Sequence, residues 1–105
     1  MFETIEGSTP GRRARFLLGE IVVSPIAARA ISQAGNREYA SNLIDCHQNG
    51  VWDEVSLEVA KANERACDEG DDIFSLHSLR NGQRVWVATD GQRQFTALFL
   101  ERDLC

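Results

Sequence analysis

The stretch from Ile73 to Leu100, IFSLHSLRNGQRVWVATDGQRQFTALFL, decides the fold. Two turn signals, Asn81-Gly82 and Asp90-Gly91, divide it into three apolar runs of strand length. These dipeptides favour two-residue hairpin loops, because a type I′ turn needs positive φ at both of its central residues. The stretch therefore predicts a three-stranded antiparallel meander.

Two-residue loops would also fix the register of the strands. The first loop predicts these cross-strand pairs: Leu79 with Arg84, His77 with Trp86, and Leu76 with Val87. The second loop predicts two more pairs: Trp86 with Phe95, and Val85 with Thr96. A four-residue second loop is the alternative, and it would place Phe95 opposite Ala88.

Side chains alternate between the two faces of a strand, so this register sorts the meander into two surfaces. The aliphatic face, which we expect helices to cover, comprises Phe74, Leu76, Val85, Val87, Leu98 and Leu100. The aromatic face comprises His77, Trp86, Phe95 and Phe99, with Ser75, Ala88 and Ala97 between them. The simplest interpretation of the aromatic face is cross-strand pairing of aromatic side chains, which stabilises a sheet. The alternatives for this face are an intramolecular cover, a dimer contact and an exposed recognition patch.

The chain before the meander predicts one strand and three helices. The strand, Phe16–Val23, is interrupted at Gly19, which indicates a bulge or a sheet edge. Ser24-Pro25 starts a helix that ends near Ala34, and Ser and Pro favour these first positions. Two more helices follow, one over about 37–48 with Asn36 as its cap and one over 57–69 with Ser56 as its cap. The order β-α-α-α-β-β-β predicts an α+β domain, with the first strand beside either outer strand of the meander.

With 105 residues, the chain is long enough for one domain with a hydrophobic core. We predict a flexible arm over residues 1–13, a domain over 14–101 and a tail over 102–105. No apolar run approaches the length of a membrane span, and the N-terminus lacks the apolar segment of a signal peptide. The sequence therefore predicts a cytoplasmic protein that does not contact a membrane.

The formal net charge of −5 is uneven, because Asp53 to Asp72 contains eight acids against Lys61 and Arg65. An acidic surface repels a phosphate backbone, so direct nucleic-acid binding is not expected. Within this stretch, the exposed acids that we predict to form a second contact surface are Asp68, Glu69, Asp71 and Asp72. A solvated loop is the simpler interpretation of the same residues.

The residues able to bind metal or act as nucleophiles are few. Cys46, His47, Cys67 and His77 do not have the spacing of a metal site, and no metal or cofactor is predicted. Cys67 lies near three acids, a setting that raises the pKa of a thiol. Asn63 falls within an apolar helix stripe, where we expect its amide to bind the backbone of the loop over 50–53.

Three segments carry a resemblance to a known family. HQNGVWDEVS (His47–Ser56), AKANERA (Ala60–Ala66) and GQRVWVATD (Gly82–Asp90) resemble small bacterial proteins of plasmids and integrated mobile elements. The resemblance covers about residues 15–100 and implies no site residues. Members are often labelled restriction–modification subunits, but this sequence has neither a glycine-rich cofactor loop nor an Asn-Pro-Pro-Tyr-like motif.

The sequence predicts a non-enzymatic protein of mobile-element origin that binds another protein, of unknown identity. The predicted contact residues are His77, Trp86, Phe95 and Phe99, because aromatic side chains dominate the energetics of interfaces. Alternatively, a second copy of the chain could bind the aromatic face and form a homodimer. An acidic nucleic-acid mimic that inhibits a DNA-binding defence complex is a second hypothesis. A small enzyme using His47, His77 or Cys67 with carboxylates is a third.

Overall fold

The computed structural model describes residues 14–35 and 38–104. The predicted arm over 1–13, the Asn36 cap and Cys105 lie outside this part of the chain. The elements follow the order β1 (Glu20–Val23), α2 (Pro25–Ala34), α3 (Tyr39–Gln48), α4 (Leu57–Glu69), β2 (Ile73–Ser78), β3 (Arg84–Thr89), β4 (Phe95–Leu100) and the 3-10 helix η1 (Glu101–Leu104). The predicted α+β class and element order are confirmed.

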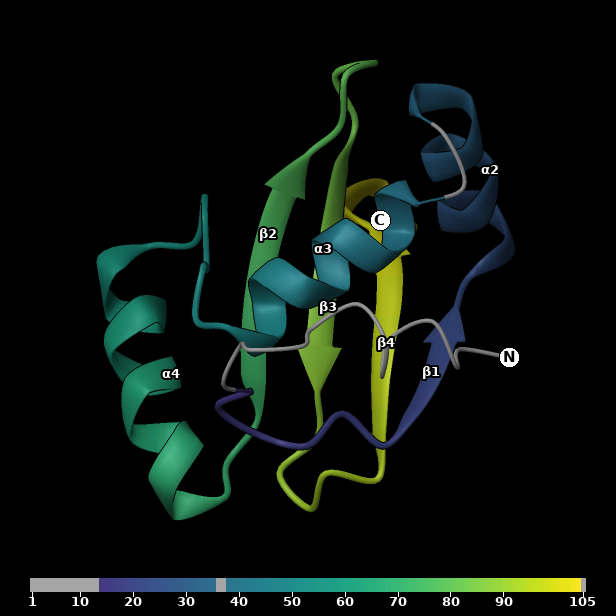
Figure 1. The fold of residues 1–105 in the computed structure, drawn as a ribbon. Coiled ribbons are helices and arrows are strands. Elements are labelled where there is room, and N and C mark those ends of the chain that lie inside the picture. Colours follow the sequence, from purple (N-terminus) through teal and green to yellow (C-terminus); the bar gives the residue numbers. More distant parts are fainter. Residues whose placement is uncertain (1–13, 36–37, 105) are drawn as a thin grey trace.

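The four strands form one sheet in the order β1-β4-β3-β2 (Figure 1). The last three strands are antiparallel, as predicted, and β1 pairs in parallel with β4. The prediction had left open which outer strand β1 would join. β1 begins only at Glu20, because Gly19 has a φ of 68° and lies against the backbone of Gln94. Phe16 and Leu18 are buried nevertheless.

Two helix starts follow the predicted capping. The Ser24 hydroxyl accepts a hydrogen bond from the backbone N–H of Ala27 at the start of α2. The Ser56 hydroxyl accepts one from Val59 at the start of α4. Such caps satisfy amide groups that have no partner within the helix.

The first hairpin differs from the prediction by one residue. The Leu79 N–H donates to the Gln83 carbonyl, so the loop has three residues, and among these only Gly82 has positive φ. A type I turn followed by a left-handed glycine forms such a loop, and it uses the same Asn-Gly dipeptide as the two-residue turn. The observed pairs are Ser78 with Arg84, His77 with Val85, and Leu76 with Trp86.

This shift reverses the two faces of β2. Ile73, Ser75 and His77 are buried on the side of Val85 and Val87. The prediction that His77 shares a face with Trp86 is therefore wrong, and so is the placement of Phe74 and Leu76 on the helix-covered face. The predicted inward residues of β3 and β4 are confirmed as buried: Val85, Val87, Leu98 and Leu100.

The second hairpin has a longer loop than predicted, but its faces are unchanged. The Asp90 carboxylate accepts hydrogen bonds from the backbone N–H groups of Gln92, Gln94 and Phe95. This places Trp86 opposite Phe99 instead of Phe95. The register moves by an even number of residues, so each side chain stays on its predicted face.

Helices α2 and α3 cover one face of the sheet, and α4 lies beside β2 (Figure 1). The core between α2, α3 and the sheet includes Ala27, Ile31, Leu43 and Ile44. Asn63 of α4 is buried, but its amide binds the N–H and C=O of Phe74 and not the predicted loop over 50–53. The predicted loop bond is wrong because α4 packs against the edge of β2.

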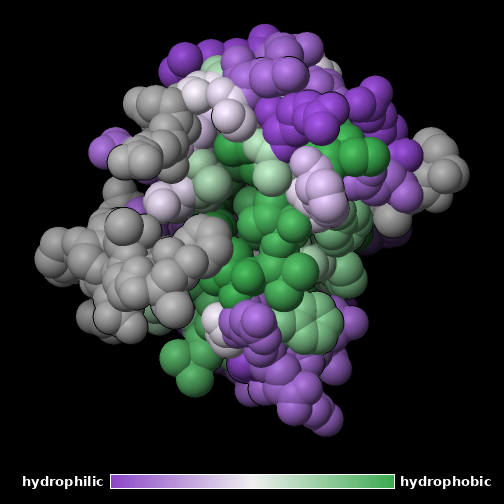
Figure 2. Space-filling model, turned by 90° about the vertical axis from the view of Figure 1, so that its right-hand side faces the viewer, coloured by the Kyte–Doolittle hydropathy of each residue, from purple (hydrophilic) through white to green (hydrophobic). Residues whose placement is uncertain are grey.

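The surface also carries apolar side chains outside the core. Viewed from the side on which β1 forms the sheet edge, hydrophobic residues gather in the middle, with hydrophilic residues above and below (Figure 2). The large hydrophobic side chains that are exposed are Leu17, Val22, Ile26, Val51, Leu57, Phe74 and Phe95.

Candidate functional site

The face of the sheet opposite α2 and α3 is crossed by no α-helix of the described residues, and we call it the open face. Its side chains are Phe74, Leu76, Trp86, Ala88, Phe95, Ala97 and Phe99. Three of the predicted contact residues, Trp86, Phe95 and Phe99, lie together here. Phe74 takes the place that was predicted for His77. Phe74 is 38 % exposed and Phe95 is 43 % exposed, so the open face presents aromatic surface to solvent.

A groove of about 310 Å³ indents the open face where α4 meets it. It is lined by Val59, Phe74, Trp86 and Phe99. Phe74 meets Trp86 edge-on, with ring centroids 6.4 Å apart. The Trp86 indole N–H is shielded from solvent and has no acceptor among the described residues. The groove therefore offers an apolar surface, and the Trp86 N–H is buried behind it.

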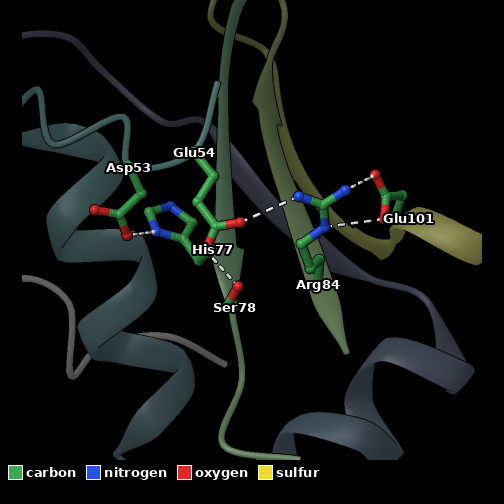
Figure 3. Close-up of polar contacts among 6 residues, drawn as sticks. All are labelled: Asp53, Glu54, His77, Ser78, Arg84 and Glu101. Atoms are coloured by element: carbon green, nitrogen blue, oxygen red, sulfur yellow. Dashed lines mark hydrogen bonds and ion pairs between the residues drawn. The ribbon is translucent and has the colours of Figure 1, made fainter. Parts of the chain in front are cut away.

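A charged cluster borders the open face at the end where β2 meets β3 (Figure 3). The Arg84 guanidinium binds Glu101 through Nε at 3.0 Å and Nη2 at 2.7 Å, and Glu54 through Nη1 at 3.1 Å. Ser78 donates to the other oxygen of Glu54. The bonds from Ser78 and Arg84 lower the pKa of Glu54, and Glu101 and Glu54 raise the pKa of Arg84. These charged side chains therefore form a polar border along one end of the apolar open face.

The four acids predicted as a second surface, Asp68, Glu69, Asp71 and Asp72, are all exposed. They lie where α4 leads into β2, beside the β3–β4 loop. Asp72 accepts a hydrogen bond from the Gly91 N–H at 2.7 Å. Arg93 donates to the backbone carbonyls of Asp71 and Ala66. Part of this acidic segment therefore anchors a loop, and Arg93 offsets part of its charge.

The buried side of the sheet contains a continuous chain of polar side chains. Thr96 donates to the Leu18 carbonyl at 2.8 Å, and its oxygen lies 2.6 Å from the Thr89 hydroxyl. Thr89 is 2.9 Å from Nε2 of His47. A carbonyl only accepts, so Thr96 uses its proton on Leu18, and Thr89 must use its own on Thr96. Nε2 of His47 is then the protonated nitrogen, and it donates to Thr89.

From His47, the buried series of hydrogen-bonded polar side chains continues to the protein surface. Nδ1 of His47 accepts from the Ser75 hydroxyl at 2.7 Å, and Ser75 accepts from Nε2 of His77 at 2.8 Å. Nδ1 of His77 lies 2.6 Å from Oδ2 of Asp53. These two hydrogen bonds fix the orientation of the His77 ring between Ser75 and Asp53.

His47 is neutral in this environment. Its ring lies edge-on to Phe16, with centroids 5.2 Å apart, and it has no exposed surface. The pKa of His47 is lowered to about 3, chiefly by burial and in part by the charges of His77 and Arg93. The neutral state agrees with the bond directions, since an unprotonated Nδ1 accepts the Ser75 proton.

The order Ser75–His77–Asp53 has the connectivity of a nucleophile–base–acid triad. Ser75 is completely buried, however, and its hydroxyl is hydrogen-bonded to both histidines. A substrate would have no path to its oxygen in this conformation. Asp53 is the one member at the surface, with 43 % of its side chain exposed, and it has a φ of 58°.

The other residues considered for catalysis or metal binding are not part of this buried polar network. The pKa of the Cys67 thiol is raised, as expected, although burial is the largest cause and the nearby acids contribute less. Within residues 14–35 and 38–104, no three His, Cys, Asp or Glu side chains come together in a way that would bind a metal ion.

The sequence prediction did not identify Asp53, Ser75, Thr89 or Thr96 as members of a common network. One signal was present: a polar side chain occurs at alternate positions of otherwise apolar strands. The predicted register placed Ser75 and His77 on the aromatic face, and it assigned no role to Thr89 or Thr96. Their partners come from four separate elements, and only the folded chain brings them together.

Comparison of the chain with protein-family models, curated proteins and solved structures gives no match. The resemblance to mobile-element proteins is therefore still a prediction. None of the described helices has both the length and the apolar character that crossing a membrane requires.

Proposed function

We propose that this protein is a non-catalytic binding module that engages another protein through the open face. The observation that supports this most directly is the exposure of two aromatic side chains on the open face: Phe74, which lines the groove at Trp86, and Phe95 on β4. Contiguous apolar surface with a polar border is typical of protein-interaction sites. In this proposal, the module belongs to the mobile-element proteins that its sequence resembles.

The chemistry of the open face fits a protein partner. Trp86 and Phe99 form the wall of the groove, and aromatic side chains at the centre of an interface contribute most to its affinity. Arg84 and its two carboxylates would form part of the polar rim.

The buried polar chain has a structural role in this proposal. Ser75 and His47 are inaccessible, and every bond of the chain has a donor and an acceptor. Fully paired buried networks specify one packing arrangement of a core. We propose that this buried polar network holds β2 in the register that exposes Phe74.

Affinity capture from a bacterial lysate tests the proposal, with Trp86→Ala and Phe74→Ala as the variants. Val51→Ala is the matched control, because Val51 is equally an exposed hydrophobic but follows α3 on the covered side. We expect one dominant protein with the wild type and the control, and its loss with both groove variants. Urea denaturation must show that the variants are folded.

Capture of the same protein by a folded Trp86→Ala variant would contradict the proposal. So would the absence of any retained protein with the wild type. Phe74 is 38 % exposed and its ring packs edge-on against Trp86, so we expect Phe74→Ala to lower stability by about 1 to 3 kcal/mol. Its effect on capture is attributable to the surface only where urea denaturation shows that the variant is folded.

A second candidate is an acidic nucleic-acid mimic that inhibits a DNA-binding complex of host defence. It is favoured by the exposure of Asp68, Glu69, Asp71 and Asp72 in one short segment. Binding through these acids would weaken steeply as salt rises, whereas binding through the open face would change little. Capture at about 50 and about 200 mM salt therefore separates the two candidates.

A further inference from the structure

The two edges of the sheet are protected very differently. At the β2 edge, Asn63 pairs with the N–H and C=O of Phe74 at 3.1 and 2.6 Å. The next outward residue, Leu76, donates to the Trp52 carbonyl and accepts from the Glu54 N–H. The outward backbone groups of Phe74 and Leu76 are thus paired within the chain, as is usual for edges that do not associate.

Among residues 14–35 and 38–104, nothing comparable covers the β1 edge. The N–H groups of Glu20 and Ser24 donate to carbonyls of the β4 side, so residues 20, 22 and 24 direct their backbone groups toward β4. The N–H and C=O groups of Ile21 and Val23 consequently point away from the sheet. No hydrogen bond joins these four groups to another residue that the structure describes.

We propose that two copies of this chain dimerise by antiparallel pairing of their β1 edges, with Val22 opposite Val22 of the second copy. In this register, Ile21 of each copy faces Val23 of the other. The two residues then exchange N–H and C=O bonds, which makes four intermolecular hydrogen bonds and leaves none of the outward groups unpaired. A two-fold axis through Val22 relates the copies, as an isologous interface requires.

The side chains around β1 are compatible with this self-pairing. Val22 is 47 % exposed, and in the dimer the two Val22 side chains would be direct cross-strand neighbours. Glu20 would face Ser24 of the second copy, so no like charges are opposed. Leu17 and Ile26, each three residues beyond an end of β1, are also exposed.

This interface uses the β1 edge and not the groove at Trp86, although Val22 lies on the open face beside Ala97. Dimerisation would join the two four-stranded sheets into one and place the two open faces side by side. Loss of the dimer and loss of partner capture are therefore separate outcomes, measured on different variants.

Sedimentation analysis of the purified chain over a concentration series gives the first test. Val22→Lys would place two like charges directly opposite each other, and we expect it to weaken the dimer at least tenfold. Val22→Thr is the matched control, because it keeps the β-branched shape without charge, and we expect it to dimerise like the wild type. A monomer up to about 1 mM, or a dimer that Val22→Lys leaves unchanged, would overturn the proposal.

Disulfide trapping tests the register itself, with Cys105 replaced by Ser in each protein. Directly opposed Cα atoms in a non-hydrogen-bonded antiparallel pair are about 4.5 Å apart, which a disulfide spans. Val22→Cys should therefore cross-link efficiently on mild oxidation, whereas Ile21→Cys should not, because Ile21 faces Val23. Failure of Val22→Cys to cross-link, or equal cross-linking of both variants, would refute this pairing.

Discussion

Acidification should destabilise this protein through His47 in particular. The imidazole is neutral when folded because burial lowers its pKa to about 3, whereas an unfolded histidine has a pKa of about 6.5. Below about pH 6.5, the unfolded chain therefore binds a proton at this residue that the folded chain does not bind. Stability contributed by His47 is present above the unfolded pKa and is lost as the pH falls toward the folded pKa.

The size of the effect follows from the difference between the two pKa values. Between about pH 6 and about pH 4, the folding equilibrium should lose close to a factor of ten per pH unit from this one group. Between about pH 7 and about pH 5, the accumulated loss is about 2 kcal/mol of unfolding free energy. A small domain has only about 5 to 15 kcal/mol in total, so the loss is readily measured.

The measurement compares urea denaturation of the wild type and His47→Gln across this pH range. The variant is less stable at pH 7 because it disrupts the bonds to Ser75 and Thr89, but it has no imidazole at this position. The stability difference between the two proteins should therefore shrink by about 2 kcal/mol on acidification. A difference that is constant with pH would refute the argument that His47 is buried in its neutral form.

Three further substitutions test backbone positions of β2 and of the two hairpin loops. Asn63→Ala should lower the unfolding free energy by about 2 to 4 kcal/mol in urea titrations, because both polar groups of Phe74 lose their partner. A loss below about 1 kcal/mol would mean that water replaces the amide. Gly91→Ala should cost about 1 to 3 kcal/mol, since its Cβ would lie 2.6 Å from the Gly70 carbonyl oxygen. Gly82→Ala, where the space is open and only the φ of 88° opposes a side chain, should cost about 1 kcal/mol in the same assay.

The element order was predictable because its signals are local. Ser24-Pro25 and Ser56 mark helix starts by chemistry within one turn, and Gly70 ends α4 with a φ of 81°. The antiparallel meander follows from two turn dipeptides and three apolar runs. None of these inferences needs a partner from another part of the chain.

The register was not predictable in the same way. Asn81-Gly82 is compatible with a two-residue and a three-residue loop, and the two differ by one residue in the pairing of β2. The alternation of residues in β2 favoured the wrong face, because Phe74 and Leu76 are more hydrophobic than Ser75 and His77. The deciding contacts are long-range, from His47 and Asp53 to the polar side chains of β2.

The buried polar chain and the open aromatic face are two consequences of that one register. If β2 slipped by one residue, Ser75 and His77 would face solvent, His47 would lose a partner, and Phe74 would enter the core. Hydrophobic burial alone does not decide between the two arrangements, because the slip would bury Phe74 but expose Ile73, and Leu76 is already buried. Specific bonds favour the observed register: His47 and Asp53 bind the inward side chains of β2, and Asn63 binds the Phe74 backbone. A fold that places hydroxyl and imidazole groups inside and phenylalanine outside gives up some stability, and sequences depart from the usual pattern in this way chiefly where a surface is used. The departure at β2 is therefore a further physical reason to assign the binding function to the open face.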